Sequence, residues 1–253
     1  MSTRPSVKGD LQHRRAFLRA AASAAAAALV GNLPFAALAQ TGAAAKMKIG
    51  TVGSGRVGKA IGGAWVRAGH EVMFSSLDLE ADRKLAASLG GGARAGTPRE
   101  AAAFGKVLLV SVPYAALPGV GRDLGDLIKG KIIIDTCNPF VARDGEMAAA
   151  AREKGVGVAS AEFLPGARIV RAFNAIGAAR MAEASGKSER VGMPIAGDDA
   201  EAISVASALI RDVGYEPVLV GTLAAMGKYL IPGTPLAGEH SPEEIRKIAA
   251  TLK

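Results

Sequence analysis

The chain has 253 residues, of which 49% are hydrophobic and 21% are charged, a globular composition that excludes a disordered chain. Only 4% of the residues are aromatic, which argues against a base-stacking surface for nucleic acids. The formal net charge of +8 would favour an anionic partner if the excess basic residues belong to the folded part of the chain.

The N-terminus has the three parts of an export signal. Residues 13–19 are basic, residues 20–30 are alanine-rich and weakly apolar, and the small-residue sequence 37–39 precedes Gln40. Removal of residues 1–39 takes away five of the 31 basic and one of the 23 acidic residues, which leaves a net charge of +4. No basic cluster remains after it, so we expect no nucleic-acid partner.

Paired arginines identify the export route. Arg14 and Arg15, followed by Phe17 and Leu18, resemble the twin-arginine signal of bacteria. We therefore predict an export signal over 1–39 and a linker over 40–46. The translocation machinery is then a partner, and the location is periplasmic or otherwise exported. The alternative is an uncleaved segment that serves as a membrane anchor.

From Met47 onward, β-branched runs alternate with helical patterns, which is typical of βαβ units and a mostly parallel sheet. Strands are predicted at 48–52, 71–74, 107–112, 131–135, 168–173, 193–196 and 216–220. Helices are predicted at 56–68, 79–89, 98–104, 114–127, 146–154, 178–184 and 200–213. The fold class is α/β, a Rossmann-type doubly wound sheet, with a nucleotide-binding domain over 47–195 and a small C-terminal lobe over 196–253.

Two helix starts have a capping box with proline at the first helical position. They begin at Thr97, with Glu100 three residues later, and at Ser241, with Glu244 three residues later.

A glycine motif joins the first strand to the first helix. Gly53, Gly55 and Gly58 have the spacing Gly-x-Gly-x-x-Gly, with Ser54, Arg56 and Val57 between them. The first glycine permits a tight turn, the second lets the backbone approach a diphosphate, and the third lets helix and strand pack closely. The alternative is a glycine-rich turn that binds no ligand.

The end of the second predicted strand bears on the choice between NAD and NADP. NAD-binding domains usually place an acidic residue there to bind the ribose hydroxyls. This chain has Ser75, Ser76, Leu77 and Asp78 after Phe74. Two hydroxyls suit a phosphate, so NADP is favoured and NAD remains the alternative. If NADP binds, Asp78 is a solvated turn residue.

Several motifs in order carry a family resemblance. The chain resembles the coenzyme F420-dependent NADP oxidoreductases, and its cofactor domain is also similar to the cytosolic domain of the STEAP metalloreductases. The resemblance covers about residues 47–230 and rests on the segments 53–58, 69–72, 111–114, 135–139, 171–174 and 196–199.

The resemblance implies an NADP(H)-binding domain that transfers hydride to or from a small-molecule redox acceptor with a flavin-like ring, such as F420 or a flavin. The implied contacts are Ser54, Gly55, Arg56 and Val57 at the diphosphate, Ser75 and Ser76 at the adenosine phosphate, Val112 and Pro113 at the riboses, and Asn138 and Ala178 near the nicotinamide. Family members commonly have basic residues where this chain has Leu77 and Ala81, and this departure weakens the phosphate assignment.

No catalytic residue is expected, because hydride transfer between two rings depends mainly on their alignment. Asn174 and Tyr114 could orient a ring or could satisfy backbone groups. Cys137 is expected to be a small buried filler, and dispersed histidines argue against a metal site. An exported nucleotide-binding sensor or scaffold without turnover is the competing function, and the sequence gives no signal for oligomeric state.

Overall fold

The computed structural model describes residues 46–183 and 191–252. The predicted export signal over 1–39 and the linker up to residue 45 lie outside the described residues, so both stay predictions. Within the described ranges, no helix has the length and apolar character needed to cross a membrane.

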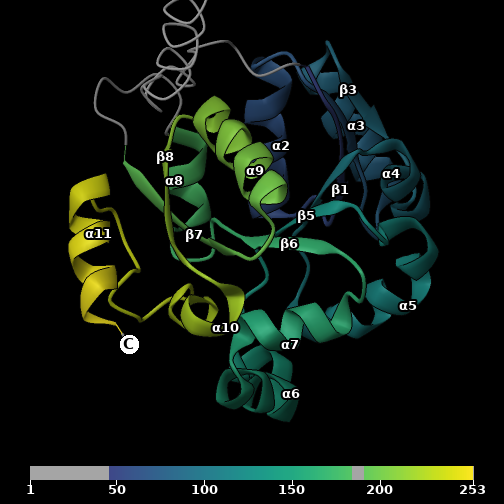
Figure 1. Ribbon diagram of the computed structural model, residues 1–253. Helices are drawn as coiled ribbons and strands as arrows, with labels where there is room; N and C mark the ends of the chain where they lie inside the picture. Colours follow the sequence, from purple (N-terminus) through teal and green to yellow (C-terminus); the bar gives the residue numbers. More distant parts are fainter. Residues whose placement is uncertain (1–45, 184–190, 253) are drawn as a thin grey trace, which may run out of the picture. The chain divides into compact units, whose positions relative to one another are not determined.

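The described part contains an eight-stranded sheet with the order β3-β2-β1-β4-β5-β6-β7-β8 (Figure 1). Its strands are β1 (Lys48–Val52), β2 (Glu71–Phe74), β3 (Ala93–Ala95), β4 (Val107–Val110), β5 (Ile132–Asp135), β6 (Arg168–Arg171), β7 (Gly192–Gly197) and β8 (Glu216–Gly221). All neighbours are parallel except β6 and β7, which are antiparallel. The doubly wound, mostly parallel Rossmann-type sheet is therefore confirmed.

Helices cover both faces of the sheet, as expected for parallel strands. They are α2 (Arg56–Arg67), α3 (Leu79–Leu89), α4 (Pro98–Phe104), α5 (Leu117–Ile128), α6 (Val141–Lys154), α7 (Val156–Phe163), α8 (Ala178–Glu183), α9 (Ala200–Val213), α10 (Leu223–Met226) and α11 (Pro242–Thr251). In Figure 1, α2 and α9 lie on one side of the sheet and α5 and α7 on the other.

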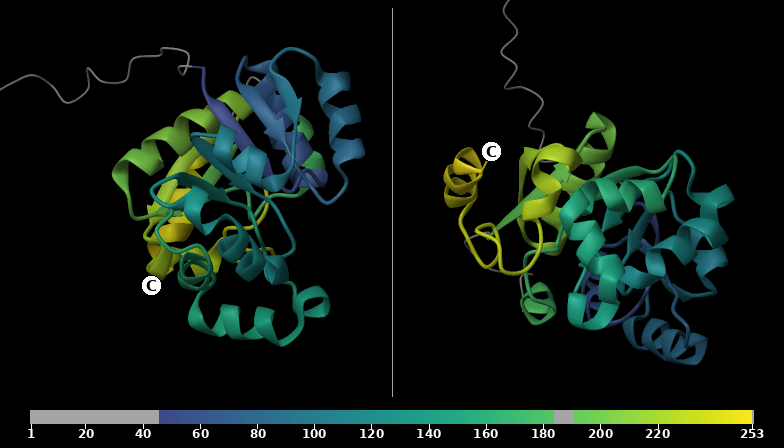
Figure 2. Two further views of the ribbon diagram at one scale, coloured as in Figure 1. Left: turned by 90° about the vertical axis from the view of Figure 1, so that its right-hand side faces the viewer. Right: turned by 90° about the horizontal axis from the view of Figure 1, so that it is seen from below.

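Two hydrophobic cores fill the space between the sheet and these helices. One includes Trp65 of α2 and Leu209 of α9, and the other includes Leu117 and Leu124 of α5. The Val-Leu-Leu-Val run of β4 is buried on both faces, which explains why its sequence does not alternate. The two views of Figure 2 place the yellow α11 at the β7–β8 end, away from the blue α3 at the β3 edge.

Local sequence signals predict several elements to the residue. The bounds of β1, β2, α3, α4 and α9 match the prediction, and both capping boxes are present. The strand predicted to run to residue 112 was too long, because β4 ends at Val110 and Ser111 begins a loop. The strand predicted to end at Phe173 was also too long, since Phe173 has a φ of 65°, which no strand residue adopts.

Some elements were not predicted, and some predicted bounds differ from those of the structure. The strand β3 has only the sequence Ala-Arg-Ala, and α7 begins directly after Gly155, whose φ is 99°. The helix α6 begins five residues before the predicted start, with a kink at Gly145. The expected boundary at 195/196 falls inside β7, and the segment after it adds β8 to the same sheet.

Candidate nucleotide-binding cleft

A cleft of about 1380 Å³ lies at the carboxyl ends of the strands. It sits where the strand order reverses, between β1 and β4, the position at which open α/β sheets bind their ligands. Its volume exceeds the usual 300–1,000 Å³ or so of a site for one drug-sized ligand. It is lined by Gly55, Arg56, Val57, Lys59, Ala60, Arg67, Ser111, Val112, Pro113, Thr136, Asn138, Phe140, Arg143, Asn174, Ala175, Ile176, Gly177, Ala178, Ala179, Pro232, Gly233 and Ala237.

The glycine motif forms one wall of this cleft, and two of its glycines are required by packing. Gly53 has a φ of 99°, and a side chain there would collide with the carbonyl of Ser111. A side chain at Gly58 would collide with the carbonyl of Gly53. The Gly53 amide donates to the carbonyl of Ser75 at 2.9 Å, which joins the turn to the end of β2. These two glycines shape the loop from beneath and do not line the cleft.

Gly55 has a different environment. A Cβ built at this position meets nothing within 4 Å, so here the backbone faces open space. Gly55 is the N-cap of α2, and in the described structure no side chain caps this helix. The first amides of α2 are therefore available to an anion at the positive end of the helix, and Arg56 and Val57 line the cleft beside them. This uncapped, open turn fits the diphosphate of a dinucleotide.

The serines expected at the diphosphate (Ser54) and at the adenosine phosphate (Ser75 and Ser76) are held by protein groups. Ser75 is buried, and its hydroxyl donates to the carbonyl of Thr51 at 2.5 Å. Ser54 and Ser76 both donate to the carboxylate of Asp82, with 2.8 Å between Ser76 Oγ and Asp82 Oδ2. Asp82 is 1% exposed and lies in the first turn of α3. The sequence analysis missed it, since nothing in its local pattern predicts that it reaches the glycine loop.

The loop after β4 forms the floor beside the glycine turn. Ser111 lines the cleft together with Val112 and Pro113, the two residues expected at the riboses. Tyr114 follows them but lies behind the wall, fully buried, with its hydroxyl 3.4 Å from the carbonyl of Val156. Burial raises the pKa of Tyr114 to about 12. Its side chain satisfies buried groups and does not line the cleft.

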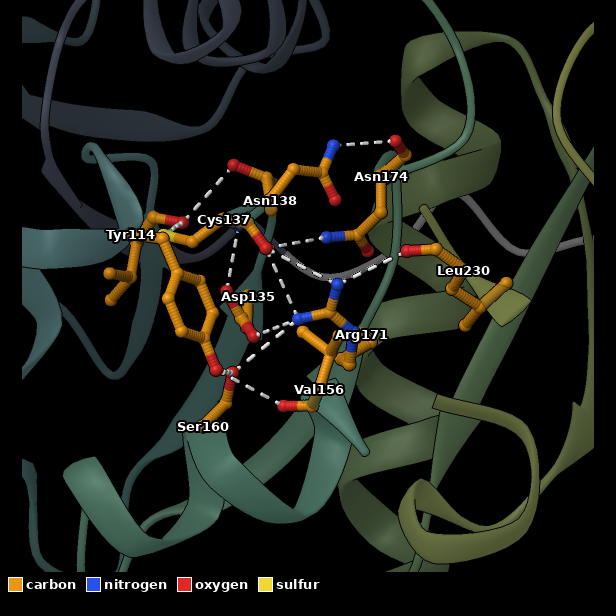
Figure 3. Close-up of polar contacts among 11 residues, drawn as sticks. Tyr114, Asp135, Cys137, Asn138, Val156, Ser160, Arg171, Asn174 and Leu230 are labelled. Carbon is orange, nitrogen blue, oxygen red and sulfur yellow. Dashed lines mark hydrogen bonds and ion pairs between the residues drawn. The ribbon is translucent and has the colours of Figure 1, made fainter. Parts of the chain in front are cut away.

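Two asparagines lie together at the other end of the cleft (Figure 3). Asn138 follows β5 and donates from Nδ2 to the backbone carbonyl of Asn174 at 2.7 Å. Asn174 follows β6 and is 2% exposed. The Oδ1 atoms of both are buried and have no hydrogen-bond partner within the described residues. Buried acceptors of this kind are usually satisfied, so the pair fits a ligand that brings N–H or O–H donors.

Backbone strain directs Asn174 to this place. Phe173, the residue before it, is the non-glycine residue with positive φ among the described residues, at 65°. The Phe173 ring is buried and packs edge-to-face on Tyr215, with 6.2 Å between ring centroids. Such a conformation costs about 1–3 kcal/mol and persists where surrounding packing enforces it. The turn ends β6 and brings Asn174 to the cleft wall.

A buried ion pair lies beneath the asparagines (Figure 3). Arg171 and Asp135 are both fully buried, and Arg171 Nη1 donates to Asp135 Oδ2 at 2.6 Å. Arg171 Nη2 also donates to the carbonyls of Cys137, at 3.2 Å, and Leu230, at 3.1 Å. The guanidinium thus ties the ends of β5 and β6 to the C-terminal segment, whose Pro232 and Gly233 line the cleft.

Cys137 packs inside this network and is 2% exposed. Burial raises the pKa of its thiol well above the ordinary value, and the neighbouring Asp135 raises it further. Its predicted role as a small buried filler is confirmed.

A second ion pair supports the loop that carries Asn138. Arg143 Nη2 donates to Asp144 Oδ2 at 2.7 Å and to the carbonyl of Asn138 at 2.9 Å. Burial opposes ionisation of Asp144, but hydrogen bonds from Arg143 and from the amides of Phe140 and Ala115 outweigh it and lower its pKa. The Asp144 carboxylate is therefore charged and fixes this loop.

The charged side chains that line the cleft are all basic. Arg56, Lys59, Arg67 and Arg143 are at the cleft, and none of its described lining residues is acidic. The described lining also contains no His, Cys, Tyr, Asp or Glu, so Lys59 is its one side chain of the kinds that act as general acids or bases. Such a lining suits an anionic ligand whose own rings carry the reactive bonds.

Seven of the expected contacts line the cleft, namely Gly55, Arg56, Val57, Val112, Pro113, Asn138 and Ala178, whereas Gly53, Ser54, Gly58, Ser75 and Ser76 do not. The fold and the uncapped glycine turn define a Rossmann-type dinucleotide-binding domain.

Comparison with known proteins defines this domain further. The model of the family described as NADP oxidoreductase, coenzyme F420-dependent, matches residues 48–139. The family resemblance is thereby confirmed over this part of the chain, which is similar to the NADP oxidoreductases that the model describes.

One curated relative and two solved structures extend the likeness. Metalloreductase STEAP3 of Rattus norvegicus is 28% identical over 181 residues, which cover 70% of this chain; the match spans about a third (34%) of that relative's length. A hypothetical protein of Sinorhizobium meliloti has a TM-score of 0.64 at 23% identity, over 77% of this chain and 95% of that one. A candidate F420-dependent NADP reductase of Arthrobacter sp. FB24 has a TM-score of 0.56 at 20% identity, over 73% and 90%. Both structures show the same fold.

Proposed function

We propose that the chain is an NAD(P)H-dependent reductase that transfers hydride between a nicotinamide nucleotide and a flavin-like acceptor, such as F420 or a flavin. The observation that carries this proposal is the two-ended cleft. An open, uncapped glycine turn lies at one end, and two buried amide oxygens without partners lie at the other.

The bound nucleotide supplies the hydride, and the residues of the chain bind and orient it. The amides at the start of α2 hold the diphosphate, and Val112 and Pro113 support the riboses. Asn138 and Asn174 accept hydrogen bonds at the ring end. Because the described lining has no acidic residue and no His, Cys or Tyr, a reaction that needs only aligned rings suits it best.

The test is to purify the protein, identify any co-purifying nucleotide by mass spectrometry, and follow oxidation of NADH and NADPH by absorbance with F420, FMN and ferric acceptors. Turnover with F420 or FMN is the expected result. Tight nucleotide binding without turnover on any acceptor would instead support the competing function, a sensor or scaffold, which the absence of His, Cys, Tyr, Asp and Glu from the described lining also permits.

The proposal includes export through the twin-arginine route. An Arg14→Lys/Arg15→Lys variant is expected to remain in the cytoplasm while the parent reaches the periplasm, as measured by cell fractionation. Equal export of both proteins would contradict this part.

A further inference from the structure

The region between the glycine loop and the end of β2, next to the cleft, is organised around the carboxylate of Asp82. This residue is 1% exposed and lies in the first turn of α3, yet it reaches two other segments. Ser54 of the glycine loop donates to its Oδ1, and Ser76, just after β2, donates to its Oδ2 at 2.8 Å. Because β1 and β2 are parallel neighbours, their carboxyl ends meet here, where dinucleotide-binding folds receive the adenosine ribose.

The hydrogen-bond directions decide what these serines can offer a ligand. A serine hydroxyl has one hydrogen and two lone pairs. Ser54 and Ser76 give their hydrogens to Asp82, and Ser75 gives its hydrogen to Thr51. Ser75 is fully buried, so Ser54 and Ser76 are the serines that can face a ligand, and both are left as acceptors; Ser76 also accepts from the amide of Asp78 at 3.1 Å and keeps one further lone pair. A ribose hydroxyl can donate to such an acceptor, whereas the oxygens of a 2′-phosphate need donors.

The surrounding charges also disfavour a 2′-phosphate at this position. Residues 75–82 contain three acidic residues and no basic residue. Asp78 caps α3 by accepting from the Ala81 amide at 3.0 Å, so this helix start is already occupied by a carboxylate. Leu77 is fully exposed at 106%, and Arg83, the first cation beyond the segment, pairs with Glu80 on the surface.

We propose that Asp82 makes this subsite selective for an unphosphorylated adenosine ribose, so that the chain binds NAD(H) more tightly than NADP(H). The proposal rests on the function proposed above, since it assigns the nucleotide that the same cleft takes. Asp82 is the specificity-determining residue. It accepts the hydroxyl hydrogens of Ser54 and Ser76, so these hydroxyls cannot donate to a 2′-phosphate.

The test is a calorimetric titration of the purified protein with NADH and with NADPH. The parent is expected to bind NADPH at least tenfold more weakly. Asp82→Ala, which frees both serine hydrogens and removes the charge, is expected to bring the two dissociation constants within about threefold of each other. Unchanged selectivity in this variant would overturn the role of Asp82.

A second variant avoids the buried position. Leu77→Arg adds a guanidinium at a fully exposed site and is expected to tighten NADPH binding severalfold without changing NADH binding. The matched control is Ala87→Arg, an exposed position near the other end of α3, which should change neither. Equal or tighter binding of NADPH by the parent would overturn the inference while leaving the reductase proposal intact. Binding of neither nucleotide would contradict the reductase proposal itself, and with it this inference.

Discussion

The two ends of the cleft are built by different means. The diphosphate end is made from backbone: the turn at Gly53, the open position at Gly55 and the uncapped start of α2. The ring end is made from side chains, with Asn138 and Asn174 resting on the buried Arg171–Asp135 pair. The first end comes from one contiguous segment, and the second needs the ends of β5 and β6 and the C-terminal segment at Leu230 to assemble. A substitution at the open Gly55 should therefore affect binding alone, whereas substitutions at the ring end should affect both stability and catalysis.

The largest expected effect is on stability at the ring end. Arg171→Met leaves Asp135 buried without its partner and should lower the free energy of unfolding by about 3–5 kcal/mol. The measurement is urea unfolding. Arg168→Met on the same strand is the control, because Arg168 pairs with the exposed Glu201 and its replacement should destabilise the protein far less. Equal losses in the two variants would contradict the importance given to the buried pair.

A smaller effect is expected on catalysis. Asn174→Ala removes a buried acceptor at the cleft wall and should lower kcat by up to roughly tenfold, the value of one hydrogen bond, with less change in KM. Steady-state kinetics with a reduced nicotinamide nucleotide and FMN measure kcat and KM separately.

A nucleotide analogue separates orientation from general damage at Asn174. The 3-acetylpyridine nucleotide has a methyl group in place of the carboxamide NH₂, so it lacks the donor that Asn174 Oδ1 would accept. The parent should discriminate against the analogue, and Asn174→Ala should do so much less. The same discrimination in both proteins would assign Asn174 a purely structural role.

The smallest effect concerns the loop that carries Asn138. The pKa of Asp144 is lower in the folded protein than in the unfolded chain, so its contribution is present above the unfolded value of about 3.9. That contribution is lost as pH falls through the lower folded pKa. Asp144→Asn should therefore cost about 1 kcal/mol or less at pH 7, since Arg143 is 45% exposed.

The check is thermal unfolding of parent and Asp144→Asn across pH. The difference in Tm should shrink toward acid, and a constant difference from pH 7 to pH 2 would show that the charge of Asp144 does not contribute.

The same contrast explains what could be predicted from the sequence. The glycine motif and the capping boxes at Thr97 and Ser241 depend on neighbours a few residues away, so local spacing predicts them. Asp82 contacts Ser54 across 28 positions, and Arg171 contacts Asp135 across 36. Such pairs form only when strand ends meet, and local patterns do not report them. The partnerless state of Asn174 Oδ1 likewise depends on packing around the turn at Phe173.

The central claim is that Gly55 leaves open the space in which the diphosphate lies, and nucleotide binding by Gly55→Ala tests it most directly. A Cβ at Gly55 meets no protein atom within 4 Å, and its φ of −64° is accessible to alanine, so the fold should be unaffected. The matched control is Gly125→Ala, a second open glycine in the interior of α5, which should keep full binding and gain up to about 1 kcal/mol in stability. Calorimetric titration with NADH is predicted to show binding at least ~100-fold weaker in Gly55→Ala than in Gly125→Ala, at an unchanged Tm relative to the parent. Equal binding by the two variants would contradict the claim.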